Sequence, residues 1–116
     1  MNQVDVIKAL EWLAQARLKQ GMLIEPLADN THYYYSQLFP LNEKKATKGF
    51  LYIAERFVVL VEKEFSDSKY WQAQTNITLG LQVQSDNESL LHLQSFIDNH
   101  DSAFPENLIN FFTGNG

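Results

Sequence analysis

The chain has 116 residues, 45% hydrophobic and 20% charged, which suits one folded domain and excludes intrinsic disorder. It contains no cysteine, which excludes disulfides, zinc–thiolate sites and iron–sulfur clusters. The net charge of −5 lies entirely in residues 85–116, which contain no lysine or arginine, so this segment should repel nucleic acid.

The first expected helix lies between Asn2 and Gly21. Apolar residues recur on one side of this segment at about 100° per residue, as on an amphipathic helix. Asn2 can cap its start, and Gly21 can follow its end in the left-handed conformation. Residues 22–28, which contain Pro26, are then expected to be a connection.

Two helices are expected in the middle of the chain. Asp29 or Asn30 can cap a short helix that ends before Pro40. A long amphipathic helix should begin near Asn42, because the apolar residues of 50–65 follow the i, i+3, i+4, i+7 rule. A turn rich in serine and aspartate follows it.

Residues 69–84 fit two patterns. Apolar and polar residues alternate in the second half of this segment, as in a half-buried strand. Tyr70, Ala73 and Ile77 nevertheless fall on one helical stripe, and no second strand is evident for pairing. A helix is therefore expected, with a strand at 75–84 as the alternative.

The C-terminal part should hold the remaining helices. Ser85 and Glu88 have the spacing of a capping box, which would open a helix that runs to about Asn99. Pro105 suits the first position of a last helix, and residues 114–116 are expected to fray. The predicted fold is all-α: a compact antiparallel bundle of five to six helices that forms a single helical domain over residues 1–113.

No motif indicates catalysis, since a nucleophile elbow and a glycine-rich phosphate loop are both missing from the sequence. Glu88 and His92 lie four residues apart on one helix face, and His32 is a third weak ligand or metal candidate. None of them has a recognised metal-ligand spacing, so no metal and no cofactor are expected. His100 is expected at a helix C-terminus, where a cation is favourable.

Two residues of the first helix are misplaced for a simple amphipathic pattern. Trp12 should point away from the apolar side, where it either packs on another helix or anchors a partner. Arg17 falls within the apolar side. It is a candidate for a buried ion pair, for example with an acid of the C-terminal segment, or else its head group reaches water at the helix end.

The other candidate partner-binding residues fall in two groups. The first is a run of three tyrosines, Tyr33, Tyr34 and Tyr35, and the second is a ridge on the long helix formed by Tyr52, Arg56, Val59 and Lys63. Three consecutive tyrosines point in three directions, so at least one should face solvent or a pocket. The ridge has the composition of an interface, although a neighbouring helix would also bury it.

These observations predict a non-catalytic protein-binding module. It would be a small acidic adaptor, inhibitor or immunity-type protein that docks a protein partner or self-associates as a homodimer. The alternatives are a small-molecule-binding domain with a pocket lined by tyrosine and histidine, and a small hydrolase or metal-dependent enzyme. Nucleic acid is not expected as a partner because the net negative charge would repel it. A membrane is not expected because no apolar run approaches the roughly 20 residues of a spanning helix. The lack of cysteine and of a signal-peptide core predicts a cytoplasmic protein.

Overall fold

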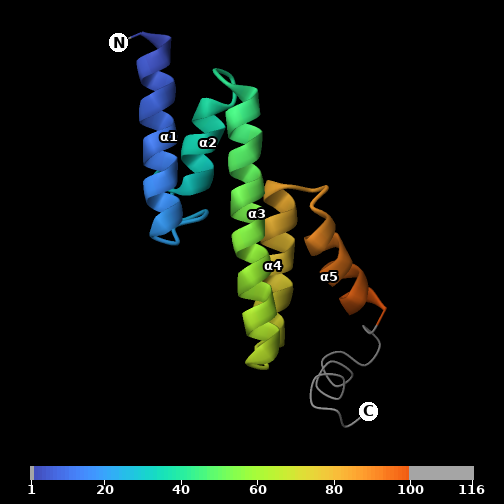
Figure 1. Ribbon diagram of the computed structural model, residues 1–116. Coiled ribbons are helices and arrows are strands. Elements are labelled where there is room, and N and C mark those ends of the chain that lie inside the picture. The colour runs from blue at the N-terminus through green and yellow to red at the C-terminus, as the bar shows by residue number, and fades with distance from the viewer. Residues whose placement is uncertain (1, 100–116) are drawn as a thin grey trace. The chain divides into compact units, whose positions relative to one another are not determined.

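The structure is a computed structural model that describes residues 2–99, and within this range it contains five α-helices and no strand. The helices are α1 (Gln3–Lys19), α2 (Thr31–Leu38), α3 (Glu43–Ser66), α4 (Tyr70–Val83) and α5 (Glu88–Asp98) (Figure 1). The all-α prediction is confirmed, and the alternative of a strand at 75–84 is wrong. His100, the helix expected from Pro105 and the tail at 114–116 lie outside the described residues.

The chain divides into two compact units, Met1–Ile53 and a second that begins at Ala54. The boundary falls within α3, so the first unit holds α1, α2 and the start of α3. The second unit holds the remainder of α3 together with α4 and α5. The single domain expected over 1–113 stays a prediction. None of the helices in residues 2–99 has both the length and the apolar character needed to cross a bilayer.

Asparagine side chains open the helices of the first unit. Asn2 Oδ1 accepts a hydrogen bond from the backbone N–H of Asp5 at 2.9 Å, which confirms the predicted cap of α1. Asn30, rather than Asp29, occupies the cap position of α2. After α1, Gly21 has φ 74°, the left-handed conformation that glycine adopts without strain.

The start of α5 differs from the prediction. Asn87 occupies the cap position, and its Oδ1 accepts from the backbone N–H of Leu90 at 3.0 Å. The Asn87 side chain is itself held by a bond from its Nδ2 to Gln84 Oε1 at 2.9 Å. The capping box of Ser85 and Glu88 is therefore wrong, because Glu88 is already the first residue of the helix.

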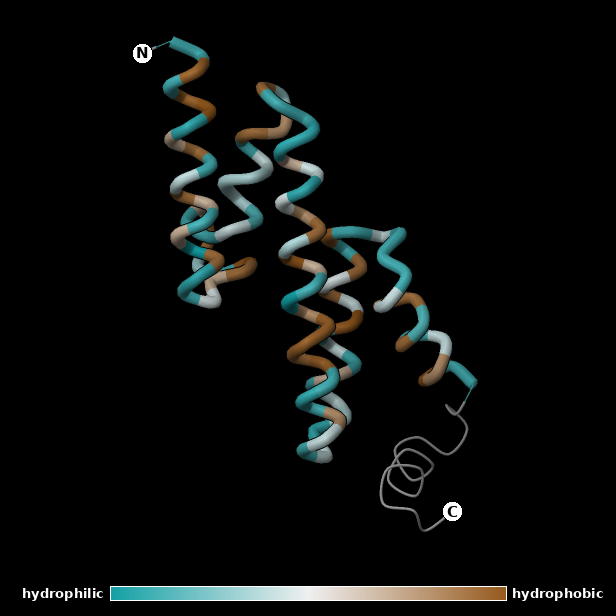
Figure 2. Tube along the Cα trace, in the orientation of Figure 1, coloured by the Kyte–Doolittle hydropathy of each residue, from teal (hydrophilic) through white to brown (hydrophobic). Residues whose placement is uncertain are grey.

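Each unit has its own buried apolar residues. In the first unit these are Ala14, Leu23, Tyr35, Leu38, Ala46 and Ile53. Among the described residues of the second unit these are Ala54, Phe57, Val61, Phe65, Tyr70, Ala73, Ile77, Leu90 and Ile97. Leu81, Leu93 and Phe96 pack against the cluster that Val61, Phe65, Tyr70, Ala73, Ile77 and Ile97 form. Figure 2 shows that apolar residues recur along α3 at intervals, as the amphipathic pattern of the sequence predicts.

The packing of Tyr35 on α3 leads to a prediction about Gly49. A Cβ atom at position 49 would overlap the Tyr35 ring, which is only 2% exposed and has little room to move. In an unobstructed helix interior, replacing glycine by alanine stabilises by about 1 kcal/mol. Here we expect Gly49→Ala to lower the free energy of unfolding by about 1–3 kcal/mol, through overpacking.

The measurement is urea unfolding followed by circular dichroism. The matched control is Thr47→Ala, an exposed position of the same helix, which should change stability by less than about 0.5 kcal/mol. A stabilised Gly49→Ala variant would contradict the tight contact between Gly49 and Tyr35.

Candidate partner-binding surface

Hydrogen bonds from Asn30 hold the loop between α1 and α2 closed. The Asn30 side chain is 5% exposed, and its Nδ2 donates to the backbone carbonyls of Ile24 at 3.0 Å and Pro26 at 2.8 Å. Its Oδ1 accepts from the backbone N–H of Tyr33 at 2.8 Å, which caps α2. One buried side chain thus fixes the loop and starts the helix, and all its polar atoms are satisfied.

The first turn of α2 is tied to the beginning of the same loop. The Met22 carbonyl accepts from both the backbone N–H of Thr31 at 2.8 Å and the Thr31 hydroxyl at 2.9 Å. The backbone N–H of His32 donates to the Leu23 carbonyl at 2.9 Å. Because Thr31 is fully buried, these bonds are shielded from water and hold the loop firmly.

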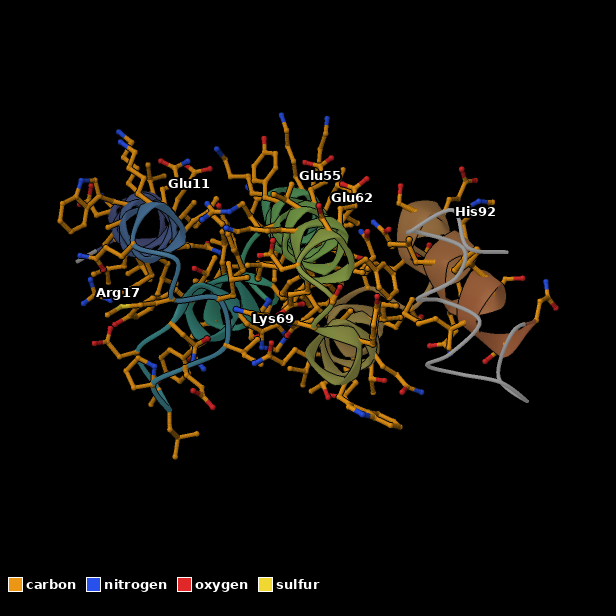
Figure 3. The ribbon with its side chains drawn as sticks, turned by 90° about the horizontal axis from the view of Figure 1, so that it is seen from below. Glu11, Arg17, Glu55, Glu62, Lys69 and His92 are labelled. Carbon is orange, nitrogen blue, oxygen red and sulfur yellow. The ribbon has the colours of Figure 1, made fainter. Side chains whose placement is uncertain are left out.

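An ion pair closes the outer side of this loop. Arg17 Nε donates to Asp29 Oδ1 at 2.8 Å, Arg17 Nη2 donates to Asp29 Oδ2 at 3.3 Å, and the Tyr34 hydroxyl donates to Asp29 Oδ1 at 2.7 Å. The Arg17 side chain, which Figure 3 labels, is 24% exposed. The partner that the sequence left open for Arg17 is therefore Asp29, at the end of the adjoining loop.

These contacts shift the pKa values of the three groups in a consistent way. The hydrogen bonds from Arg17 and Tyr34 lower the pKa of Asp29, because they stabilise its carboxylate form. The same bonds raise the pKa of Arg17 and the pKa of Tyr34, whose protonated forms are the donors. Asp29 is ionised and Tyr34 protonated at neutral pH in any case, and the network extends the pH range over which both states persist.

Leu27 is the outstanding feature of the loop, because its side chain is 95% exposed. It adjoins a surface groove of about 640 Å³ lined by Met22, Ile24, Glu25, Pro26 and Leu27 itself. The next residue, Ala28, has φ 62°, a left-handed conformation that is uncommon for alanine. The hydrogen-bonded loop thus presents an aliphatic side chain and an apolar groove to solvent.

Trp12 is a second exposed apolar side chain of the first unit. It lies on α1 and is 69% exposed, so packing on another helix, one of the two alternatives left by the sequence, does not bury it within this unit. Glu11 beside it forms an ion pair with Lys45 at 3.1 Å, so neighbouring residues of α1 and α3 are joined while Trp12 is left in solvent. Packing within the unit does not account for the large side chain at this position, and its role in binding stays a prediction.

The tyrosine run takes three different positions. Tyr33 is half-buried and packs edge-on against Tyr34, with the ring centroids 5.3 Å apart. Tyr34 serves the Asp29 network. Tyr35 is buried, and burial raises the pKa of its hydroxyl. The prediction that Tyr35 contacts a partner is therefore corrected: its ring belongs to the core of the unit.

His32 packs in an aromatic cluster instead of lining an open ligand site. Its ring centroid lies 5.4 Å from that of Phe50, and Phe50 stacks on Phe39 with centroids 6.3 Å apart. Burial lowers the pKa of His32, so the neutral imidazole is favoured. These contacts explain why the histidine is half-buried without invoking a ligand.

The remaining predicted residues lie on α3 and α5. Tyr52 is half-buried, Arg56 is exposed and Val59 is 61% exposed. Glu88 and His92 are exposed on α5 and line one groove. Within residues 2–99, no three histidine, aspartate or glutamate side chains come together in a way that could hold a metal ion.

Sequence reasoning missed Leu27 and assigned its segment to a connection. The available signal was an aliphatic residue in a segment without helical or strand periodicity, directly after Pro26.

Comparison of the chain with protein-family models, with curated proteins and with solved structures finds no match.

The double role of Asn30 can be separated by substitution. Asn30→Ala removes the cap and the donor to the Ile24 carbonyl, while the Pro26 carbonyl keeps the backbone N–H of Asp29 at 3.1 Å. We therefore expect a loss of about 2–4 kcal/mol in unfolding free energy. Asn30→Asp keeps the cap acceptor but not the donors, so it should still destabilise. Asn2→Ala removes an exposed cap alone and should cost about 1 kcal/mol. Equal effects of the two alanine substitutions, measured by urea unfolding, would contradict the bracing role.

The Asp29 network makes stability depend on pH. Because the folded-state pKa of Asp29 is lowered below its ordinary value of 3.8, the network stabilises the fold above that value. This contribution should vanish as the pH falls below 3.8 and through the lowered pKa. Asp29→Asn should therefore be less stable than wild type at pH 6, and the difference should shrink on acidification. Urea titrations at several pH values test this, and a pH-independent difference would contradict it.

Proposed function

We propose that this protein is a non-catalytic binding module that docks a second protein on the first unit, with loop 21–30 as the contact surface. The observation that carries the proposal is Leu27, 95% exposed on a loop that hydrogen bonds from the buried side chains of Asn30 and Thr31 hold in place. The fold gains nothing from Leu27 in water. Its full burial against a partner would contribute roughly 1.5–3 kcal/mol.

A braced loop is well suited to binding, because ordering it on association costs little further entropy. The groove that Leu27 lines also includes the apolar side chains of Met22, Ile24 and Pro26, which an apolar side chain of the partner could contact. Trp12 supplies a second contact on α1, and tryptophan is among the residues that most often dominate interface energies. The proposed partner is therefore a folded protein with an apolar patch, and a second copy of this chain is an outcome that the test distinguishes.

The alternatives from the sequence gain no support from these contacts. The tyrosines and His32 that would line a small-molecule pocket are engaged in packing or in the Asp29 network. We retain the cytoplasm as the proposed compartment because the chain lacks cysteine.

The test uses a photoreactive amino acid placed at position 27, at position 12 or at the exposed control position Gln37, which lies at the end of α2 away from loop 21–30. We expect adducts in cells from positions 27 and 12, and none from position 37. With the captured protein in hand, calorimetry should show that Leu27→Glu or Trp12→Ala weakens binding by about tenfold or more. Because both side chains are exposed, the Leu27→Glu and Trp12→Ala substitutions should leave the unfolding free energy unchanged within about 0.5 kcal/mol.

Two results would count against the proposal. Adducts that form equally from all three positions would indicate non-specific collision. The second result is that the adducts contain only two copies of this chain and that sedimentation shows a dimer which Leu27→Glu dissociates. This result would indicate self-association instead of a separate partner protein.

A further inference from the structure

A groove in the second unit combines apolar side chains with carboxylates. It measures about 420 Å³ and is lined by Val58 and Glu62 of α3 and by Glu88, Ser89, His92 and Leu93 of α5. Figure 3 shows the labelled Glu62 and His92 on the same side of this unit. The lining thus combines the aliphatic side chains of Val58 and Leu93 with two glutamates that come from different helices.

The two glutamates are available to a cation within the described part of the chain. Three other acids of this unit have partners: Glu64 accepts from Asn76 at 2.8 Å, Asp67 pairs with Lys63 at 3.9 Å, and Asp98 accepts from Gln94 at 3.0 Å. Within the described residues, neither Glu62 nor Glu88 has a hydrogen bond or an ion pair from its side chain. Each of the two helices that line the groove therefore contributes a carboxylate without a basic partner among these residues.

The charge of the whole unit has the same sign. Residues 54–99 contain seven acidic and three basic side chains, a net charge of −4. Residues 2–53 contain five acidic and six basic side chains, a net charge of +1. The groove thus lies in the acidic unit, whose field attracts cationic partners and repels phosphate backbones.

We propose that this groove binds a basic segment of a partner protein, in which lysine or arginine side chains flank an aliphatic one. The glutamates would pair with the cationic groups, and Val58 and Leu93 would contact the aliphatic side chain. A simple cation needs no aliphatic wall, and an apolar ligand needs no carboxylates. This surface is separate from loop 21–30, so the inference does not rest on the proposed function.

The test measures fluorescence anisotropy with a short labelled peptide built from the repeat Lys-Ala-Leu-Lys. We expect saturable binding to the wild-type protein, weakened by about tenfold or more in the double variant Glu62→Gln/Glu88→Gln. Replacing leucine by serine in the peptide should weaken binding by a similar factor, because the aliphatic contact is lost. A peptide with glutamate in place of lysine should not bind.

The matched control is Glu55→Gln/Asp86→Asn, which removes the same charge from exposed positions of the same unit outside the groove lining. It should weaken binding by less than about threefold, because neither side chain lines the groove and so neither pairs directly with the peptide. Ser89→Lys is a second groove variant; its exposed site should preserve the fold, and its like charge should abolish binding.

Three results would overturn the inference. They are no binding of the basic peptide to wild type, equal weakening in the two double variants, and a wild-type dimer that Glu62→Gln/Glu88→Gln dissociates. The second would indicate general attraction to an acidic surface, and the third would place a second copy of the chain on the groove. Circular dichroism melting of every variant shows whether the fold is retained.

Discussion

The Asn30 side chain joins two structures that depend on each other, the closed loop after α1 and the first turn of α2. Its amide nitrogen satisfies the carbonyls of Ile24 and Pro26, and its oxygen caps the helix at Tyr33. Asparagine is the shortest side chain that provides two N–H donors together with a carbonyl acceptor. Because the Asn30 side chain is 5% exposed, replacing it would remove three partly buried hydrogen bonds at once, and the exposed position of Leu27 depends on them.

The two units offer different recognition chemistry. The first is nearly neutral and presents the apolar side chains of Leu27 and Trp12 on hydrogen-bonded elements. The second is acidic and presents Glu62 and Glu88 in one groove with aliphatic side chains. Apolar anchors govern how tightly a partner is held, whereas uncompensated charges govern which partner approaches and how fast. A protein with both surfaces is suited to selective, non-covalent docking.

Part of the candidate site was predictable from the sequence, and part was not. Trp12 was identified because a helical wheel alone places it opposite the apolar side of α1. Tyr35 was misassigned because three consecutive tyrosines give no indication of which one faces the core; the close approach of Gly49 decides that. The cap at Ser85 was wrong since Asn87, two residues later, is an equally good acceptor, and Gln84 fixes its side chain.

Local spacing determined which segments are helical. The apolar period of a helix is visible over about two turns, and a cap bond joins residues three positions apart, so both signals are local in the sequence. Only the tertiary structure decided that Arg17 meets Asp29, twelve positions away, and that Leu27 is left in solvent. It also brought Glu62 and Glu88 to one groove. The loop after α1 brings Asp29 to Arg17, whereas the apolar cluster shared by α3, α4 and α5 brings Glu62 and Glu88 together.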